Sequence, residues 1–213
     1  MSKTVAYYSP KEEFLNIWSH AIAAGAAVIA GVFLLMKSLL FSPVYIVSMG
    51  VFAASMVCLF LVSSLYHAAE NEERRARFRV FDHCAIFVFI AGTYTPFSLL
   101  VLKGSIGWWI FGISWCLAVI GIALKIWFTG QFKILSTSIY VFMGWIIIFV
   151  GKTLVESFSA EGFFWLAAGG VVYTLGAVVY LLKQVHYSHA IFHIFVVFGA
   201  ACHFYSAYQY ILV

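Results

Sequence analysis

The stretch VYIVSMGVFAASMVCLFLVSSLYHA, residues 44–68, decides the fold of this chain. It contains no Lys, Arg, Asp or Glu over its whole length. A helix that crosses the hydrocarbon core of a bilayer needs roughly 20 consecutive, mainly apolar residues. The stretch is long enough and apolar enough to cross, and it predicts a membrane-spanning helix.

The rest of the chain repeats this pattern. Further apolar runs cover about 14–36, 80–101, 106–127, 134–155, 163–183 and 188–212, separated by short polar breaks. Hydrophobic residues make up 64% of the 213 residues and charged residues 9%. In a typical soluble domain, about 45–50% of residues are apolar and about 25% are charged. This composition excludes a soluble globular enzyme, a disordered chain and a nucleic-acid binder.

The apolar runs predict helices and not barrel strands, because residues 146–150 (IIIFV) show none of the apolar–polar alternation of a membrane barrel. The expected fold is therefore all-α: a polytopic membrane protein with a seven-transmembrane helix bundle. No linker or repeat divides the chain, so residues 1–213 are expected to form a single domain.

The distribution of Lys and Arg predicts the orientation. With the N-terminus cytoplasmic, the outer segments hold only Lys37, Lys103 and Lys152. The inner segments hold the other nine of the twelve: Lys3, Lys11, Arg74, Arg75, Arg77, Arg79, Lys125, Lys133 and Lys183. Because cytoplasmic loops carry an excess of Lys and Arg, we expect the C-terminus outside.

Ionisable and polar side chains gather in one layer of this topology, the cytoplasmic third of the bilayer. The layer contains Glu13, Asn16, His20, His67, Asp82, His83, His189 and His193. Only His203 stands apart, about 15 Å further along its span by helical rise. Such side chains are costly inside a membrane, so their convergence indicates a functional site.

The spacing of His189 and His193 favours a metal site, because residues four apart lie on one face of a helix. His67 lies at the right depth to supply a third ligand, and zinc is the usual ion for such a set. Three imidazoles leave a fourth position open for water, as in catalytic zinc sites. Asp82 is the candidate partner of that water, and Ser63, one turn before His67, is a second catalytic candidate.

Simpler interpretations stay open. The histidines can be hydrogen-bonding contacts between helices, and Ser63 can be a serine bonded to its own helix backbone. Glu13 and Asn16 are interpreted as an interfacial anchor. His20 and His203 are interpreted as packing contacts, with a proton-handling role as the alternative. The mixed-charge residues 70–79 are expected to form a solvated loop facing anionic headgroups.

Several motifs in order resemble those of the bacterial hemolysin III family, in its TrhA-like branch. They are residues 12–20 (EEFLNIWSH), 63–67 (SSLYH), 81–83 (FDH), 91–97 (AGTYTPF), 144–145 (GW), 189–193 (HAIFH) and 202–203 (CH). This family is similar to the progestin and adipoQ receptors, which are related to alkaline ceramidases. The resemblance implies a multi-pass protein of the bacterial inner (plasma) membrane, with a cytoplasmic-side Zn²⁺ held by His67, His189 and His193. It also places the superfamily's serine at Ser63 and its aspartate at Asp82.

The resemblance implies three functions. The first is a zinc-dependent hydrolase of a lipid acyl bond, amide or ester, with Asp82 and Ser63 as catalytic residues. The second is a non-enzymatic, receptor-like regulator of membrane lipid or energy homeostasis, and the third is a cytolytic pore. The expected partners are membrane lipids and a lipid-like substrate or ligand, with no nucleic acid; the oligomeric state is left open.

Overall fold

The computed structural model describes residues 7–182 and 184–213. The elements follow in the order α1 (Pro10–Ser38), α2 (Pro43–Ala68), α3 (Glu72–Pro96), η1 (Phe97–Leu102), α4 (Gly104–Phe128), α5 (Lys133–Gly144), η2 (Ile146–Val150), α6 (Gly151–Ser157), α7 (Ala160–Leu181) and α8 (Ser188–Tyr210). Within the described residues, seven helical segments are long and apolar enough to cross a membrane. The third of them joins α3 to η1, and the fifth joins α5, η2 and α6.

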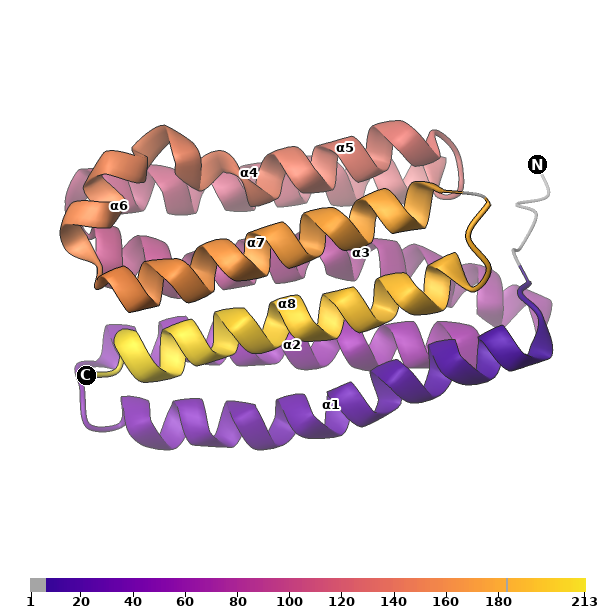
Figure 1. The fold of residues 1–213 in the computed structure, drawn as a ribbon, viewed down its shortest axis with the longest axis horizontal. Coiled ribbons are helices and arrows are strands. Elements are labelled where there is room, and N and C mark those ends of the chain that lie inside the picture. The colour runs from indigo at the N-terminus through magenta and orange to yellow at the C-terminus, as the bar shows by residue number, and fades with distance from the viewer. Residues whose placement is uncertain (1–6, 183) are drawn as a thin grey trace.

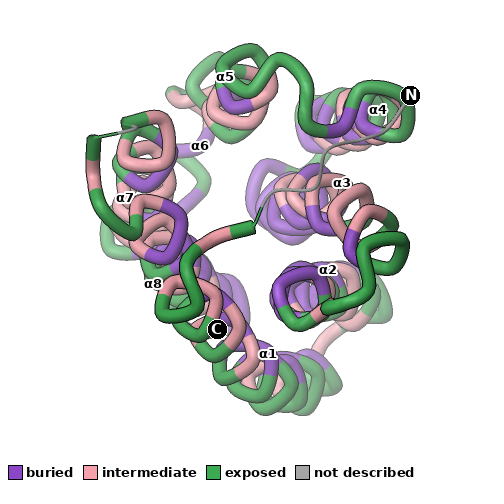
Figure 2. Tube along the Cα trace, turned by 90° about the vertical axis from the view of Figure 1, so that its right-hand side faces the viewer, coloured by how far each residue is buried: buried purple, intermediate pink, exposed green. Residues whose placement is uncertain are grey.

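The helices lie side by side and pack into a bundle (Figure 1). Around the interior, α1, α2, α3, α5, α7 and α8 contact one another in this order, and α8 closes the ring on α1 (Figure 2). Helix α4 packs on α3 and η1. We call the end where α2 finishes and α8 begins the histidine end of the bundle.

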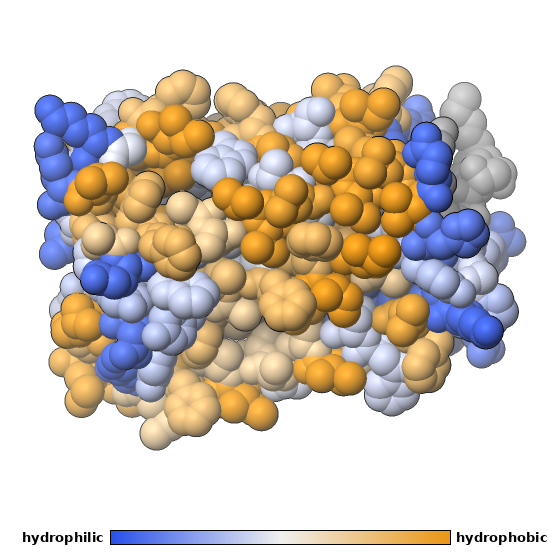
Figure 3. Space-filling view, viewed as in Figure 1, coloured by the Kyte–Doolittle hydropathy of each residue, from blue (hydrophilic) through white to orange (hydrophobic). Residues whose placement is uncertain are grey.

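The outside of the bundle has the surface of a membrane protein. A wide apolar belt covers the visible face, with hydrophilic residues gathered at its two ends (Figure 3). Exposed side chains such as Ile22, Trp109 and Phe149 belong to this apolar surface. The helix α1 begins at the histidine end and α8 finishes at the opposite end, as an odd number of spans requires (Figure 1). Which end faces the cytoplasm stays a prediction; Lys3 and Lys183, two of the cations that support it, lie outside the described residues.

The third span begins earlier than the sequence predicted, at Glu72 and not near residue 80. Residues 70–79 were expected to be a loop, and this was wrong for most of them. The Asn71 side chain caps the helix by accepting a hydrogen bond from the Arg74 backbone N–H at 3.0 Å. Glu72 and Glu73 occupy the first turn, where negative charge favours a helix. The same span changes from α-helix to π-helix after Pro96, whose ring removes one backbone donor.

The fifth span is interrupted, whereas the sequence predicted one continuous run over 134–155. Helix α5 ends at Gly144, and the 3₁₀ segment η2 separates it from α6. The Tyr94 hydroxyl of α3 donates to the Gly144 carbonyl at 2.9 Å and accepts from the Ile147 backbone N–H at 3.1 Å. This side chain from another span satisfies backbone groups that the interruption leaves without helical partners.

Close packing of α3 and α4 makes one glycine sensitive to substitution. A Cβ atom on Gly121 would lie 2.3 Å from the Phe87 ring, which is 1% exposed. We expect Gly121→Ala to lower the free energy of unfolding by about 1–3 kcal/mol, because a filled core has no room for an added methyl group. Thermal unfolding of the purified protein in detergent measures the change. Gly112→Ala, on the same helix with no atom within 4 Å of the added Cβ, is the control; equal melting temperatures for both variants would contradict the packing.

Candidate metal centre

Three buried histidines from two helices meet at the histidine end. His67 lies in the last turn of α2, and His189 and His193 lie at the start of α8. One ring nitrogen from each lies within 4.8 Å of the other two. The Nε2 atoms of His67 and His189 are 3.1 Å apart. The structure thus brings together the three residues whose spacing and depth predicted a metal site.

The geometry and chemistry of this group fit a zinc ion. Zn–N bonds of about 2.0–2.1 Å in a tetrahedral site place ligand nitrogens about 3.3–3.4 Å apart, close to the spacing of the His67 and His189 Nε2 atoms. All three imidazoles are at least nine-tenths buried. Three neutral nitrogen ligands leave room for a further ligand, which is the pattern of catalytic zinc sites.

The orientation of His67 is set by a carboxylate on another helix. His67 Nδ1 donates to Glu13 Oε2 of α1 at 2.7 Å, which leaves Nε2 to face the other histidines. Glu13 also forms an ion pair with Arg75 of α3, and Arg75 is only 2% exposed. The Arg75 guanidinium donates in turn to the His67 carbonyl at 3.0 Å, at the end of α2. A carboxylate that orients a ligating histidine is a common support for zinc.

His193 is oriented by a different part of α1. Its Nδ1 donates to the Asn16 carbonyl at 3.3 Å, and the Ser19 hydroxyl lies 3.4 Å from the same nitrogen. The His20 ring stacks on the His193 ring, with centroids 3.7 Å apart. The Nδ1 atoms of His67 and His193 therefore both bond to residues of α1. These bonds fix the orientation of the rings from α2 and α8 relative to each other.

The third ring, His189, is covered by a residue ahead of α1. The Tyr8 ring stacks on it with centroids 4.7 Å apart, and the Tyr8 backbone N–H donates to Glu13 Oε1 at 3.3 Å. Burial raises the pKa of the Tyr8 phenol well above its ordinary value, so this cover is neutral. The stacked ring limits the approach of water to His189 from this side.

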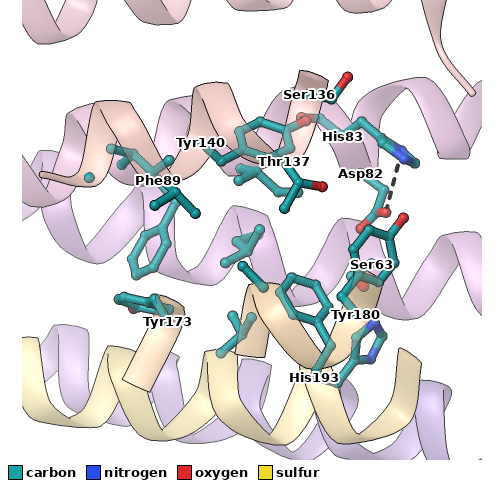
Figure 4. A pocket seen from close by; sticks show the side chains of 18 of the residues that line it. Ser63, Asp82, His83, Phe89, Ser136, Thr137, Tyr140, Tyr173, Tyr180 and His193 are labelled. Carbon is teal, nitrogen blue, oxygen red and sulfur yellow. Dashed lines mark hydrogen bonds and ion pairs between the residues drawn. The ribbon is translucent and has the colours of Figure 1, made fainter. Parts of the chain in front are cut away.

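A cavity adjoins the histidines inside the bundle. The cavity has a volume of about 230 Å³ and opens to the outside, and His189, His193, Ser63 and Asp82 all line it. Figure 4 shows Asp82, Ser63 and His193 gathered at one end of this space, with Phe89 and Tyr173 further along it. These polar side chains therefore lie at one end of a mainly apolar chamber.

The two predicted catalytic side chains differ in their surroundings. The Ser63 hydroxyl is buried and has no hydrogen-bond partner among the described residues. Asp82 is 9% exposed, and one of its carboxylate oxygens lies 3.7 Å from His83 Nδ1. Each keeps hydrogen-bonding capacity for a molecule in the cavity, although no distance within bonding range joins either one to the three histidines.

His203 lies away from this centre, as its place in the sequence predicted. Its Nε2 donates to the Leu166 carbonyl of α7 at 3.1 Å. The interpretation of Glu13 and Asn16 as an interfacial anchor was wrong, since Asn16 is 0% exposed and Glu13 bonds His67. A signal for their role was present: Glu13, Asn16 and His20 follow the spacing of one helical face in a mostly apolar helix.

Comparison with known proteins supports the family resemblance. A family model described as "Haemolysin-III related" matches residues 8–204. The chain belongs to the haemolysin-III related family. Within it, the chain is 38% identical to "Hemolysin-3" of Bacillus cereus over 203 residues, which cover 95% of this chain and 93% of the relative. It is 39% identical to "Hemolysin-3 homolog" of Bacillus subtilis (strain 168) over 204 residues, covering 95% and 96%.

The similarity of this haemolysin-III related chain extends beyond bacteria. It is 27% identical to the human "Monocyte to macrophage differentiation factor" over 168 residues, which cover 76% of this chain and 69% of the relative. No solved structure matches the chain significantly. The family and its seven spans identify a multi-pass membrane protein.

Proposed function

We propose that this haemolysin-III related protein is a zinc-dependent hydrolase of a lipid acyl bond, amide or ester, in the bacterial inner membrane. The observation that carries the proposal is the position of the three histidines at the polar end of a cavity between membrane-spanning helices. A structural zinc site is usually closed by four protein ligands, whereas this group offers three and adjoins open space. The cavity walls suit an acyl chain, because Leu59, Ile86 and Phe192 are among their apolar side chains.

Zinc at this centre would supply Lewis-acid polarisation of the carbonyl and a lowered pKa for water. In this proposal Asp82 accepts the proton of the attacking water and returns it to the leaving amine or alcohol. The unpartnered Ser63 hydroxyl is available to donate to the oxygen that becomes negative in the transition state. The Asn16 carbonyl of α1 accepts a hydrogen bond from His193, and the Tyr8 ring stacks on His189, so both rings have orienting contacts outside the cavity.

A test of the hydrolase measures fatty-acid release by mass spectrometry, using purified protein in nanodiscs made from bacterial lipids. We expect release by the zinc-loaded protein, loss after chelation, and recovery after zinc is restored. Asp82→Asn should lower the rate by about 10²–10⁴-fold, the usual effect of losing a general base, while keeping the zinc. Glu161→Gln, which changes an exposed carboxylate in the first turn of α7, is the control. Release that survives complete metal removal would refute the proposal.

A second candidate is a receptor-like protein in which zinc has a structural role. It is favoured by the contacts that tie α1, α2, α3 and α8 together around the histidines. Here chelation would lower the melting temperature while the lipid composition of the nanodisc stays unchanged over time. The same mass-spectrometric measurement therefore separates the two candidates. A cytolytic pore is less well supported, because the cavity walls are mainly apolar.

A further inference from the structure

Three cations line the cavity close to its polar end. They come from three different helices: Arg79 from α3, Lys125 from α4 and Lys133 from α5. We call them the basic collar. Among the described residues, Asp82 is the one carboxylate that lines the same cavity. With neutral histidines, the cavity therefore carries a net positive charge.

Lys125 shows that the collar is more than a set of surface charges. It is only 5% exposed, although it lies in the last turn of a membrane-spanning helix. Its Nζ donates to the Ser136 hydroxyl at 2.6 Å and lies 5.7 Å from the centre of the Tyr140 ring. No carboxylate lies within ion-pair distance of Lys125 in the part of the chain that the structure describes. A buried ammonium group is costly unless an anion accompanies it.

The other two cations lie against neighbouring parts of the chain. The turn at Gly130 has a φ of 84°, and a Cβ there would lie 2.7 Å from Arg79 Nη2, so glycine lets the guanidinium lie against the turn. Lys133 Nζ donates to the Tyr180 carbonyl at 2.8 Å and lies 3.7 Å from the centre of the Tyr180 ring. The Lys/Arg excess expected on the cytoplasmic side explains why cations occur at this end. It does not explain why Lys125 is buried and lines a cavity.

We propose that the basic collar binds the phosphate of an anionic phospholipid whose acyl chain occupies the apolar part of the cavity. The proposal rests on the hydrolase function and names its substrate class. Arg79 lies three residues before Asp82 on α3, about one helical turn away. In a glycerophospholipid the acyl ester is only a few bonds from the phosphate. A phosphate in the collar would therefore bring an ester carbonyl toward Asp82, Ser63 and the histidines.

The test compares two ligands that differ only in the phosphate: a short-chain phosphatidic acid with ether-linked chains, which cannot be hydrolysed, and the diacylglycerol analogue with the same ether-linked chains. Equilibrium binding to the zinc-loaded, detergent-purified protein is measured by calorimetry, with inorganic phosphate as a third ligand. We expect phosphatidic acid to bind at least about tenfold more tightly than diacylglycerol, as charge-assisted hydrogen bonds imply. We also expect inorganic phosphate to bind more weakly than phosphatidic acid, because it lacks acyl chains.

Variants separate charge from packing. Lys125→Met keeps the approximate length of the side chain and should lower the affinity for phosphatidic acid about tenfold. Lys125→Arg, which keeps the positive charge, should have the affinity of the wild-type protein. Lys152→Met, which changes a lysine whose side chain is 90% exposed, is the control for net charge. Zinc content and melting temperature confirm that each variant is folded.

Equal binding of the two lipids, or an unchanged preference in Lys125→Met, would overturn the collar. The proposal would also be overturned if inorganic phosphate bound as tightly as phosphatidic acid. In that case the acyl chains would add no affinity, and the site would bind free phosphate and not a lipid. The experiments can refute the basic collar and the hydrolase proposal independently of each other. Phosphate-dependent lipid binding without fatty-acid release supports the collar and removes the hydrolase. Release that is indifferent to the phosphate and to Lys125→Met removes the collar alone.

Discussion

Replacing His193 with alanine is expected to remove the bound zinc. The wild-type protein should carry about one zinc per chain, and the variant less than about a tenth, because two imidazoles on two helices hold an ion far more weakly than three. The melting temperature should fall as well, since a metal that binds only the folded state stabilises that state. Metal analysis by mass spectrometry and thermal unfolding with and without chelator measure both effects.

His203→Ala is the matched control for that experiment. His203 is a buried histidine of the same helix, 8% exposed, and its ring bonds the Leu166 carbonyl away from the metal centre. This variant should keep its zinc even if it loses some stability. A His193→Ala protein that retains a full complement of zinc would show that the ion, if present, is held elsewhere.

Replacing Glu13 with glutamine is expected to lower the zinc affinity about 10–100-fold, the usual effect of changing a residue that orients a metal ligand. Glutamine keeps the shape of the side chain but removes the charge that holds His67 Nδ1 and Arg75. The free energy of unfolding should fall by about 1.5–3 kcal/mol, because a hydrogen bond to a charged group is lost in a buried setting. Competition with a chelator of known affinity measures the first effect, and thermal unfolding the second.

Two further variants make the Glu13 result specific. Glu12→Gln changes the adjacent carboxylate, which forms no ion pair with a histidine among the described residues, and should leave the zinc affinity unchanged. Arg75→Met tests whether the arginine acts through Glu13, in which case the double variant should be hardly worse than Glu13→Gln alone. A Glu13→Gln protein with wild-type zinc affinity would mean that the carboxylate supports the fold and not the metal centre.

Much of the candidate metal centre, the approach of the three histidines, could be predicted from the sequence. Because the residues of a helix repeat every 3.6 positions, the spacing of His189 and His193 places both rings on one face. The depth of His67 in its span then made it the natural third member. Glu13 was misinterpreted because its position near the start of a span is equally typical of an interfacial anchor. Its contact with His67 depends on how α1 packs on α2, and no local pattern contains that information.

The interrupted fifth span could not be predicted for a similar reason. Residues 146–150 are as apolar as any other part of the chain, so hydropathy gives no sign of a break. The Tyr94 hydroxyl, which makes the break tolerable, comes from another span about 50 positions earlier. Local composition predicts whether a segment lies in the membrane, but not which neighbour satisfies its backbone.

The sequence by itself determined that this chain crosses a membrane seven times as helices, because only helices satisfy every backbone group of such apolar runs without a partner strand. It also determined the layer in which the polar side chains meet, because helical rise converts position in a run into depth. Only the tertiary structure decided which ring nitrogens face one another and which carboxylate orients them. His67 and His189 are 122 positions apart in the chain, and the 3.1 Å between them results from the packing of α2, α8 and α1. That packing depends on every side chain between the helices.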